Sequence, residues 1–354
     1  MNRKRAVLIP IALLLLPLIM SGVTVEVQAQ VQPVHNVAVS VASLAGIVNE
    51  VGGSLINTSI LLEQETEPHA FTITPDIIAM ADVADLLVFT GHFHWEEELA
   101  NQTSTPFVTF HDDNAWENYE DYGAQFSPMP GDDVEEIDEH DHEGNPHAFW
   151  LLPKNALAIA NVTRVALSTL NSTLTGTWNA NFASFEEKMA DLQSLIAELD
   201  EVHEFSQLRA IVVSPPEAYV AEAFGIQIDA VLQVGEITIS GAQLLEVQTS
   251  LRNGSVQLIL GSDVAQFQTG GEYAYQLQVD NGGTLIWWKT VFYPDADYFS
   301  MMTFNLGALV SGIEGRSGSI GDQTVNIGLL SLSLVLGFIA LIEAVLLIQR
   351  ARAE

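Results

Sequence analysis

The chain has 354 residues, which is enough for two medium-sized lobes and excludes a peptide or a small cross-linked scaffold. It carries 12 Lys and Arg against 45 Asp and Glu, a formal net charge of -33, so its surface repels phosphate backbones and excludes nucleic-acid binding; cations are its natural partners. Cysteine is absent, which excludes disulfides and thiolate chemistry and leaves metal binding to histidine and carboxylates.

Both ends of the chain have the composition of membrane-targeting segments. Residues 1–29 begin with basic residues, continue into an apolar run and end in a small-residue pattern, which predicts a signal peptide. Residues 325–348 are almost entirely apolar and, at about 1.5 Å per residue, long enough for a transmembrane helix. Arg350 and Arg352 place the tail of residues 349–354 in the cytoplasm. We therefore expect a single-pass protein at the extracellular face of the plasma membrane.

Between these ends, short β-rich runs alternate with helical patterns. Thr74 and Pro75 predict the start of a helix, because threonine caps helix N-termini and proline fits the first turn. In the first half we expect strands at residues 35–40, 58–62, 85–90 and 107–110, and helices at residues 44–51 and 74–82. This alternation predicts a parallel sheet covered by helices on both faces.

The same alternation returns in the second half, after a long helical stretch at residues 153–170 and 181–202. Strands are expected at residues 208–214, 226–232 and 256–260, with helices ending at Phe224 and starting near Ser240. The predicted fold class is α/β, with two lobes that each hold a mainly parallel sheet flanked by helices and are joined by a long rigid helix. The predicted domains are an N-terminal metal-binding lobe (30–152), a connecting helical segment (153–205), a C-terminal lobe (206–313) and a glycine-rich flexible tether (314–324) before the transmembrane helix.

The nine histidines are placed unevenly, and several follow expected strands. His69 and His147 each follow a proline, and His92 and His94 share one face of an expected extended segment. Any one of them alone is best explained as a buried structural histidine. Together they favour a metal site, because loops at strand ends present ligands in open α/β sheets and zinc binds imidazole readily.

An acidic His loop, residues 112–143, contains thirteen Asp and Glu and no Lys or Arg. Such a composition predicts a solvated, disordered loop that cannot bury a core. His140 and His142 lie within it, so the loop is also a candidate for weak capture of cations near a tighter site.

Motifs of catalysis are missing from the sequence. It contains no nucleophile elbow, no phosphate-binding glycine loop and no His-Glu-x-x-His pair. We therefore predict that the protein is not an enzyme.

Three segments in order resemble a known family. Glu67-Pro68-His69 is followed by the Thr74-Pro75 helix start, and residues 145–156 begin with Asn-Pro-His and lie directly after the acidic His loop. Residues 297–306 are similar to the same family's last-helix signature. This pattern, over residues 35–313, resembles the zinc/manganese substrate-binding proteins of metal ABC importers, a periplasmic solute-binding protein family, in its zinc-type form with a loop rich in His and acids.

The resemblance implies a rigid two-lobed fold that holds a metal ion between the lobes, with His69 and His147 as the first two ligands. The family's third ligand falls at Ser214, a poor ligand, and Glu217 one turn later is the candidate substitute. Its fourth ligand has no clear counterpart; three acids are distant candidates, namely Asp263, Asp280 and Asp295. Three alternatives stay open: C-terminal carboxylates, completion by His92 and His94, or a degenerate site in which only the loop binds metal.

The resemblance implies a receptor that captures Zn²⁺, or Mn²⁺, and delivers the ion to an ABC permease; with the predicted transmembrane helix, we expect this receptor to be membrane-anchored and monomeric. The alternative is a cell-surface adhesion or structural protein on the same fold with degenerate or loop-only metal binding.

Overall fold

The structure, a computed structural model, describes residues 35–62, 66–130, 144–235, 237–293 and 297–317. The predicted signal peptide, transmembrane helix and cytoplasmic tail lie outside these residues, as do His140 and His142. Within the described ranges, no helix combines the length and apolar character that a membrane span requires.

The N-terminal sheet is entirely parallel, with the strand order β2-β1-β3-β4-β5. Its strands are β1 His35–Val39, β2 Ile56–Ile60, β3 Leu86–Val88, β4 Phe107–Thr109 and β5 Glu117–Asn118. Val37 of the inner strand β1 pairs with Thr58 on one side and Leu86 on the other. The strands at the centre are apolar on both faces because helices cover both sides, as the sequence predicts.

Four helices accompany this sheet: α1 Ala42–Gly52, α2 Pro75–Asp82, α3 His94–Gln102 and α4 Pro153–Leu170. The predicted start of α2 is confirmed, since Thr74 Oγ1 accepts a hydrogen bond from the Ile77 amide at 3.4 Å. Helix α3 was not predicted. Seven 3-10 turns complete the described chain: η1 Gly53–Leu55, η2 Pro68–Ala70, η3 Tyr119–Tyr122, η4 Phe149–Leu151, η5 Ser172–Leu174, η6 Phe205–Gln207 and η7 Ala265–Phe267.

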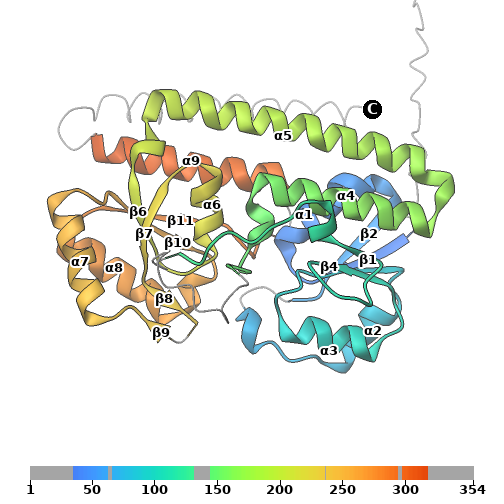
Figure 1. Cartoon of the computed structure of the whole chain (residues 1–354). Helices are drawn as coiled ribbons and strands as arrows, with labels where there is room; N and C mark the ends of the chain where they lie inside the picture. Colours follow the sequence, from blue (N-terminus) through green and yellow to red (C-terminus); the bar gives the residue numbers. More distant parts are fainter. Residues whose placement is uncertain (1–34, 63–65, 131–143, 236, 294–296, 318–354) are drawn as a thin grey trace, which may run out of the picture. The chain divides into compact units, whose positions relative to one another are not determined.

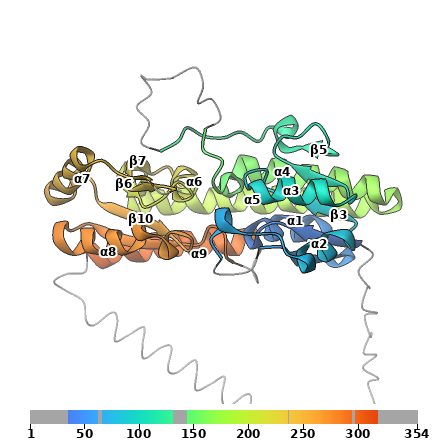
Figure 2. The same cartoon turned by 90° about the horizontal axis from the view of Figure 1, so that it is seen from below.

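The C-terminal sheet is also parallel, with the strand order β11-β10-β6-β7. Its strands are β6 Arg209–Val212, β7 Gln227–Val231, β10 Leu258–Ser262 and β11 Thr284–Trp288, and a small antiparallel pair is formed by β8 Gln233–Val234 and β9 Ile237–Thr238. Its helices are α6 Glu217–Ala223, α7 Gly241–Asn253 and α8 Thr269–Asn281. Ala210 and Val212 pack in the cluster that includes α6, whereas Ile211 and Val213 pack with α7 and α8. Both views show α7 beside β6 and β7 (Figures 1 and 2).

Two long helices run past these sheets: α5 Thr175–His203 and α9 Tyr298–Ser317. α4 and α5 pack side by side (Figures 1 and 2). α5 buries a stripe of residues spaced by three and four, namely Phe185, Met189, Leu192 and Ile196. The salt bridge between Lys188 Nζ and Glu50 Oε2, at 2.7 Å, joins α5 to α1. The predicted α/β fold with two parallel sheets flanked by helices is therefore confirmed.

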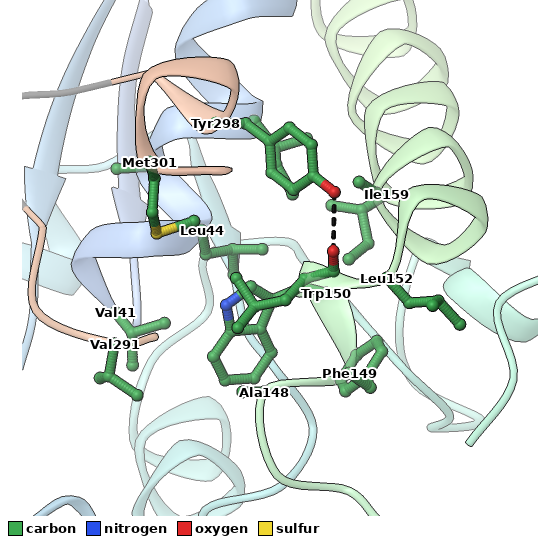
Figure 3. Packing of buried hydrophobic residues seen from close by; sticks show 14 of the residues in the cluster. Val41, Leu44, Ala148, Phe149, Trp150, Leu152, Ile159, Val291, Tyr298 and Met301 are labelled. Atoms are coloured by element: carbon green, nitrogen blue, oxygen red, sulfur yellow. Dashed lines mark hydrogen bonds between the residues drawn. The ribbon is translucent and has the colours of Figure 1, made fainter. Parts of the chain in front are cut away.

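Two side chains with polar tips fasten the centre of the core (Figure 3). The indole of Trp150 donates to Ser43 Oγ at 2.8 Å, and the hydroxyl of Tyr298 donates to the Leu151 carbonyl at 2.7 Å. Trp150 and Tyr298 are fully buried. Because Tyr298 is the first residue of α9, the second bond ties the last described helix to the turn that follows His147.

The prediction that all of residues 112–143 form a solvated loop is wrong for residues 112–130. This part contains β5 and η3, and the fully buried Tyr119 donates from its hydroxyl to the Phe89 carbonyl at 2.7 Å. Phe126 stacks on Phe110 with ring centroids 3.8 Å apart. Buried and stacked aromatic side chains thus anchor part of a segment whose overall composition is acidic.

The predicted flexible tether also begins too early, because α9 continues to Ser317. The glycine at position 312 serves close packing there. A Cβ on Gly312 would lie 2.9 Å from Ile286 Cδ1, closer than carbon atoms approach without displacement. The glycine therefore lets the helix approach β11.

Tyr298→Phe tests the contribution of the buried bond between α9 and η4. Its loss leaves the Leu151 carbonyl unpaired, so we expect the free energy of unfolding, measured with urea, to fall by about 1–2 kcal/mol. Tyr275→Phe is the matched control, since Tyr275 is 63% exposed and the same change there should cost less than about 0.5 kcal/mol. Equal effects of the two changes would contradict a stabilising role of this bond.

Candidate metal centre

Three histidines converge at the carboxyl ends of the N-terminal strands. His69 lies in η2 after β2, His92 follows β3, and His147 lies just before η4. One nitrogen from each ring lies within 4.8 Å of the others, and the ring centroids of His92 and His147 are 4.3 Å apart. Among the residues that the structure describes, this is the one group of three or more metal-ligating side chains so close together. Open α/β sheets bind ligands at this edge, where successive strand-end loops meet.

Burial keeps two of the three rings neutral. It lowers the pKa of His92 to about 2, with smaller contributions from the neighbouring His147 and His69. Burial likewise lowers the pKa of His147 to about 4, with His69 contributing. His92 Nε2 is buried and has no hydrogen-bond partner among the described residues. A neutral imidazole nitrogen with a free lone pair is what a transition metal binds, whereas His69 is exposed and leaves the cluster open to entry of an ion.

Glu96 fixes the loop that carries His92. Its buried carboxylate accepts hydrogen bonds from the amides of Thr90, Gly91, His92 and Phe93, at 2.7 to 3.2 Å. Burial raises the pKa of Glu96, while hydrogen bonds from Ser40, Thr90 and Phe93 act against that rise. Because Glu96 belongs to the first turn of α3, the helix and the ligand loop hold each other in place.

The segment around His69 is held by both carboxylate and aromatic contacts. Glu67 Oε2 accepts from the Ala70 amide at 2.7 Å, which closes the η2 turn around His69. The Trp95 indole donates to the Pro68 carbonyl at 3.2 Å. Phe93 packs edge-on against His69, with centroids 5.3 Å apart. Trp95 of α3 and its N-cap residue Phe93 thus brace η2, so the His69 and His92 loops share one support.

Asn145 orients His147. Its Oδ1 accepts from the His147 amide and lies 3.0 Å from Nδ1, so Nδ1 is the protonated nitrogen and Nε2 carries the free lone pair. Ala148 follows in the left-handed region with φ of 59° and is buried. This strained turn directs the chain straight from His147 into η4.

His94 lies apart from the cluster. The prediction that His92 and His94 share one face of an extended segment is wrong, because helix α3 begins at His94 after Phe93 as its N-cap. The His94 side chain is 90% exposed and lies 4.0 Å from Glu97. The structure therefore brings only His92 of this pair into the centre.

The C-terminal candidates are occupied by hydrogen bonds. Glu217 is fully buried, accepts from the Ser214 amide and hydroxyl at 3.0 Å, and has its pKa raised to about 8 by burial. Asp263 is buried and accepts from Thr290, Val291 and Phe292. Asp280 is exposed and accepts from Gln276, and Asp295 lies outside the described residues. Among the described residues, none of these acids joins the histidine cluster.

This arrangement provides three nitrogen ligands and leaves a fourth coordination position free of described side chains. A tetrahedral zinc ion takes His nitrogens at about 2.0–2.1 Å, so the rings need only a small inward movement to share one ion. The exposed ring of His69 has the freedom to make it.

Sequence reasoning missed the supporting residues Glu96, Asn145 and Trp95. A signal existed for two of them. Glu96 stands at the third helical position that a capping box uses, and Asn145 stands two residues before a predicted ligand. Trp95 gave no signal beyond its position next to the predicted ligands.

Two parallel sheets with a histidine cluster at one sheet edge define a metal-binding solute-binding protein. The family model described as the periplasmic component A of the zinc-uptake complex, ZnuA, matches residues 37–312, and the chain belongs to this family. The predicted family is thereby confirmed, as is the prediction that the protein is not an enzyme, because members of this family are solute-binding proteins. No curated protein matches the chain.

Solved structures share the fold at low sequence identity. The crystal structure of ZnuA is 17% identical, covers 78% of this chain and 98% of its own, and has a TM-score of 0.64. A zinc-bound variant of AdcAII from Streptococcus pneumoniae is 20% identical, with coverages of 79% and 98% and a TM-score of 0.63. FpvC from Pseudomonas aeruginosa in complex with Mn²⁺ is 17% identical, with coverages of 80% and 99% and a TM-score of 0.61. Zinc and manganese, the two predicted ions, are thus both bound by proteins of this fold.

The lowered pKa values predict a pH-dependent stability. Below the ordinary histidine pKa of about 6.5, the unfolded chain binds protons that folded His92 and His147 do not, so the free energy of unfolding falls as the pH falls from 6.5 towards 4. We expect the loss between pH 8 and pH 5.5, measured by urea unfolding in EDTA, to be about 1 kcal/mol smaller in His92→Phe than in the parent. His94→Phe, at an exposed position, should retain the parental pH dependence. Identical pH dependence in all three proteins would show that His92 is not held neutral.

Proposed function

We propose that the protein captures Zn²⁺ with His69, His92 and His147. The observation that carries this proposal is the buried Nε2 of His92, which lacks a hydrogen-bond partner among the described residues and lies within 4.8 Å of the other two ligand atoms. A buried polar atom without a partner costs free energy, and a bound ion removes that cost. Three imidazoles favour zinc over manganese, which prefers carboxylate and water oxygens.

In this proposal all three protein ligands precede the long helical connection, and the fourth position takes water or a ligand from outside the described residues. Glu217 is a poor ligand because burial keeps it protonated near neutral pH and both of its oxygens accept from Ser214. His140 and His142 have the role of weak cation ligands, because the negative charge of the acidic residues around them attracts cations.

Calorimetry of the full-length chain with Zn²⁺ and Mn²⁺ tests the ligand set. We expect His69→Ala, His92→Ala and His147→Ala each to weaken zinc binding by about 100-fold or more, since even outer-shell changes cost 10–100-fold. His94→Ala is the matched control and should bind within about twofold of the parent, because its side chain is exposed and outside the cluster.

Two results would overturn the three-histidine site. One is parental zinc affinity in the His92→Ala protein. The other is binding that survives all three substitutions and disappears only when residues 131–143 are deleted, which would favour the alternative of a surface protein with loop-only metal binding.

We further propose that the chain works as a monomer, anchored by residues 325–348 at the extracellular face of the plasma membrane, and delivers its ion to an ABC permease. The apolar composition of this segment and the two basic residues after it support the anchor. Anchoring keeps the receptor near a membrane partner at high effective concentration, which free diffusion in an open medium does not.

Fractionation of expressing cells tests the anchor. The full-length chain should remain with the membranes after carbonate extraction, whereas a chain ending at residue 324 should be released, because only the apolar segment holds it there. A chain in which residues 349–354 alone are removed is the control and should stay in the membrane. Release of the full-length chain by carbonate would contradict the proposed span.

A further inference from the structure

Asn145 is bonded on both sides: to the metal centre and to the C-terminal lobe. It is fully buried, and its Oδ1 accepts from the amide of His147 and faces Nδ1 of the same residue at 3.0 Å. Its Nδ2 donates to the Pro215 carbonyl at 3.0 Å. One amide side chain therefore contacts a ligand ring and the turn after β6 at the same time.

The link to the C-terminal lobe has further parts. The Asn145 carbonyl accepts from the hydroxyl of Tyr219 in α6, and that hydroxyl accepts from the Ser127 amide at 2.9 Å. The Pro215 carbonyl also accepts from the Ala218 amide at 3.1 Å, in the first turn of α6. His147 precedes the connecting helices in sequence, yet its support is attached to the start of α6.

We infer that Asn145 transmits zinc occupancy from His147 to helix α6, so that the C-terminal lobe responds to the metal although it supplies no described ligand. This inference rests on the proposed role of His147 as a ligand. It makes Asn145 a positioning residue that couples the two lobes by hydrogen bonds, in the place where a direct C-terminal ligand would otherwise couple them.

Polarisation along the chain of bonds gives the physical mechanism. A cation on Nε2 withdraws electrons from the imidazole and makes Nδ1–H a stronger donor to Asn145 Oδ1. An amide whose oxygen accepts a stronger bond donates more strongly from its nitrogen, so the bond from Nδ2 to the Pro215 carbonyl strengthens as well. Because Asn145 and Pro215 are buried, little solvent competes with this effect.

Asn145→Asp separates the two sides of the link. Aspartate has the same shape and still accepts from His147, and in its ionised form it has no proton to donate to the Pro215 carbonyl. Hydrogen exchange of the full-length chain, with and without saturating Zn²⁺, reads the response at the amides of residues 218–224. In the parent we expect zinc to slow these amides severalfold. In Asn145→Asp we expect zinc affinity at or above the parental value together with loss of that slowing.

Asn155→Asp is the matched control for a buried asparagine. Asn155 is also fully buried and donates from Nδ2 to the Gln125 and Phe149 carbonyls, but it bonds neither a cluster histidine nor α6. This variant should lose stability and keep the zinc-dependent slowing at residues 218–224. Slowing retained in Asn145→Asp, or missing in a zinc-bound parent, would overturn the inference.

NMR spectroscopy tests whether Asn145 determines which nitrogen of His147 is protonated. Imidazole ¹⁵N NMR of the metal-free full-length chain at pH 8 should show His147 protonated on Nδ1 in the parent and in Asn145→Asp, and protonated mainly on Nε2 in Asn145→Ala. The same Nδ1 protonation in Asn145→Ala would also overturn the inference. A parent that binds no zinc, or a His147→Ala protein that binds it normally, would instead refute the proposed function.

Discussion

The centre of this protein depends on the cost of charging a buried imidazole. His92 and His147 are largely shielded from water, and three imidazoles lie so near one another that a proton on one ring disfavours protonation of the next. Because the rings stay unprotonated, their nitrogen lone pairs remain available. One divalent ion can then interact with all three lone pairs at once, whereas protons on neighbouring rings would repel one another. The surrounding structure therefore has to hold neutral rings close together without giving them hydrogen-bond donors of their own.

Buried acidic side chains organise loops that follow strands, and Glu96 does so for the loop that carries His92. Glu96 gathers the amides that follow β3, Glu217 accepts from Ser214 after β6, and Asp263 gathers the amides that follow β11. A carboxylate that accepts several backbone bonds has few lone pairs left for a metal. These acids therefore shape the loops at the sheet edges, which leaves the three histidines as the proposed ligands.

The sequence predicted the regular elements well, because caps, prolines and apolar periodicity act locally: α4 begins at Pro153 and ends at Leu170, the predicted bounds. The prediction from sequence failed where one or two contacts between residues far apart in the chain determine the local structure. Tyr119 and Phe126 order an acidic segment, and Ile286 explains a glycine inside α9. The centre was half predictable for the same reason. His69 and His147 stand in recognisable segments, whereas the inclusion of His92 and exclusion of His94 depend on the start of α3, which Glu96 sets through the folded loop.

The proposed set of three imidazole ligands also gives the acidic residues of the chain a different role. Neutral imidazoles leave the full charge of a bound Zn²⁺ uncompensated, whereas a carboxylate ligand would cancel part of it. The formal charge of -33 supplies a negative field around the centre instead, but beyond about 8 Å that field is screened at physiological ionic strength. Only acids close to the ion can offset its charge. The three proposed nitrogen ligands leave that charge in place, so an ion held by them and by water in the fourth position depends on the nearby acids for charge balance.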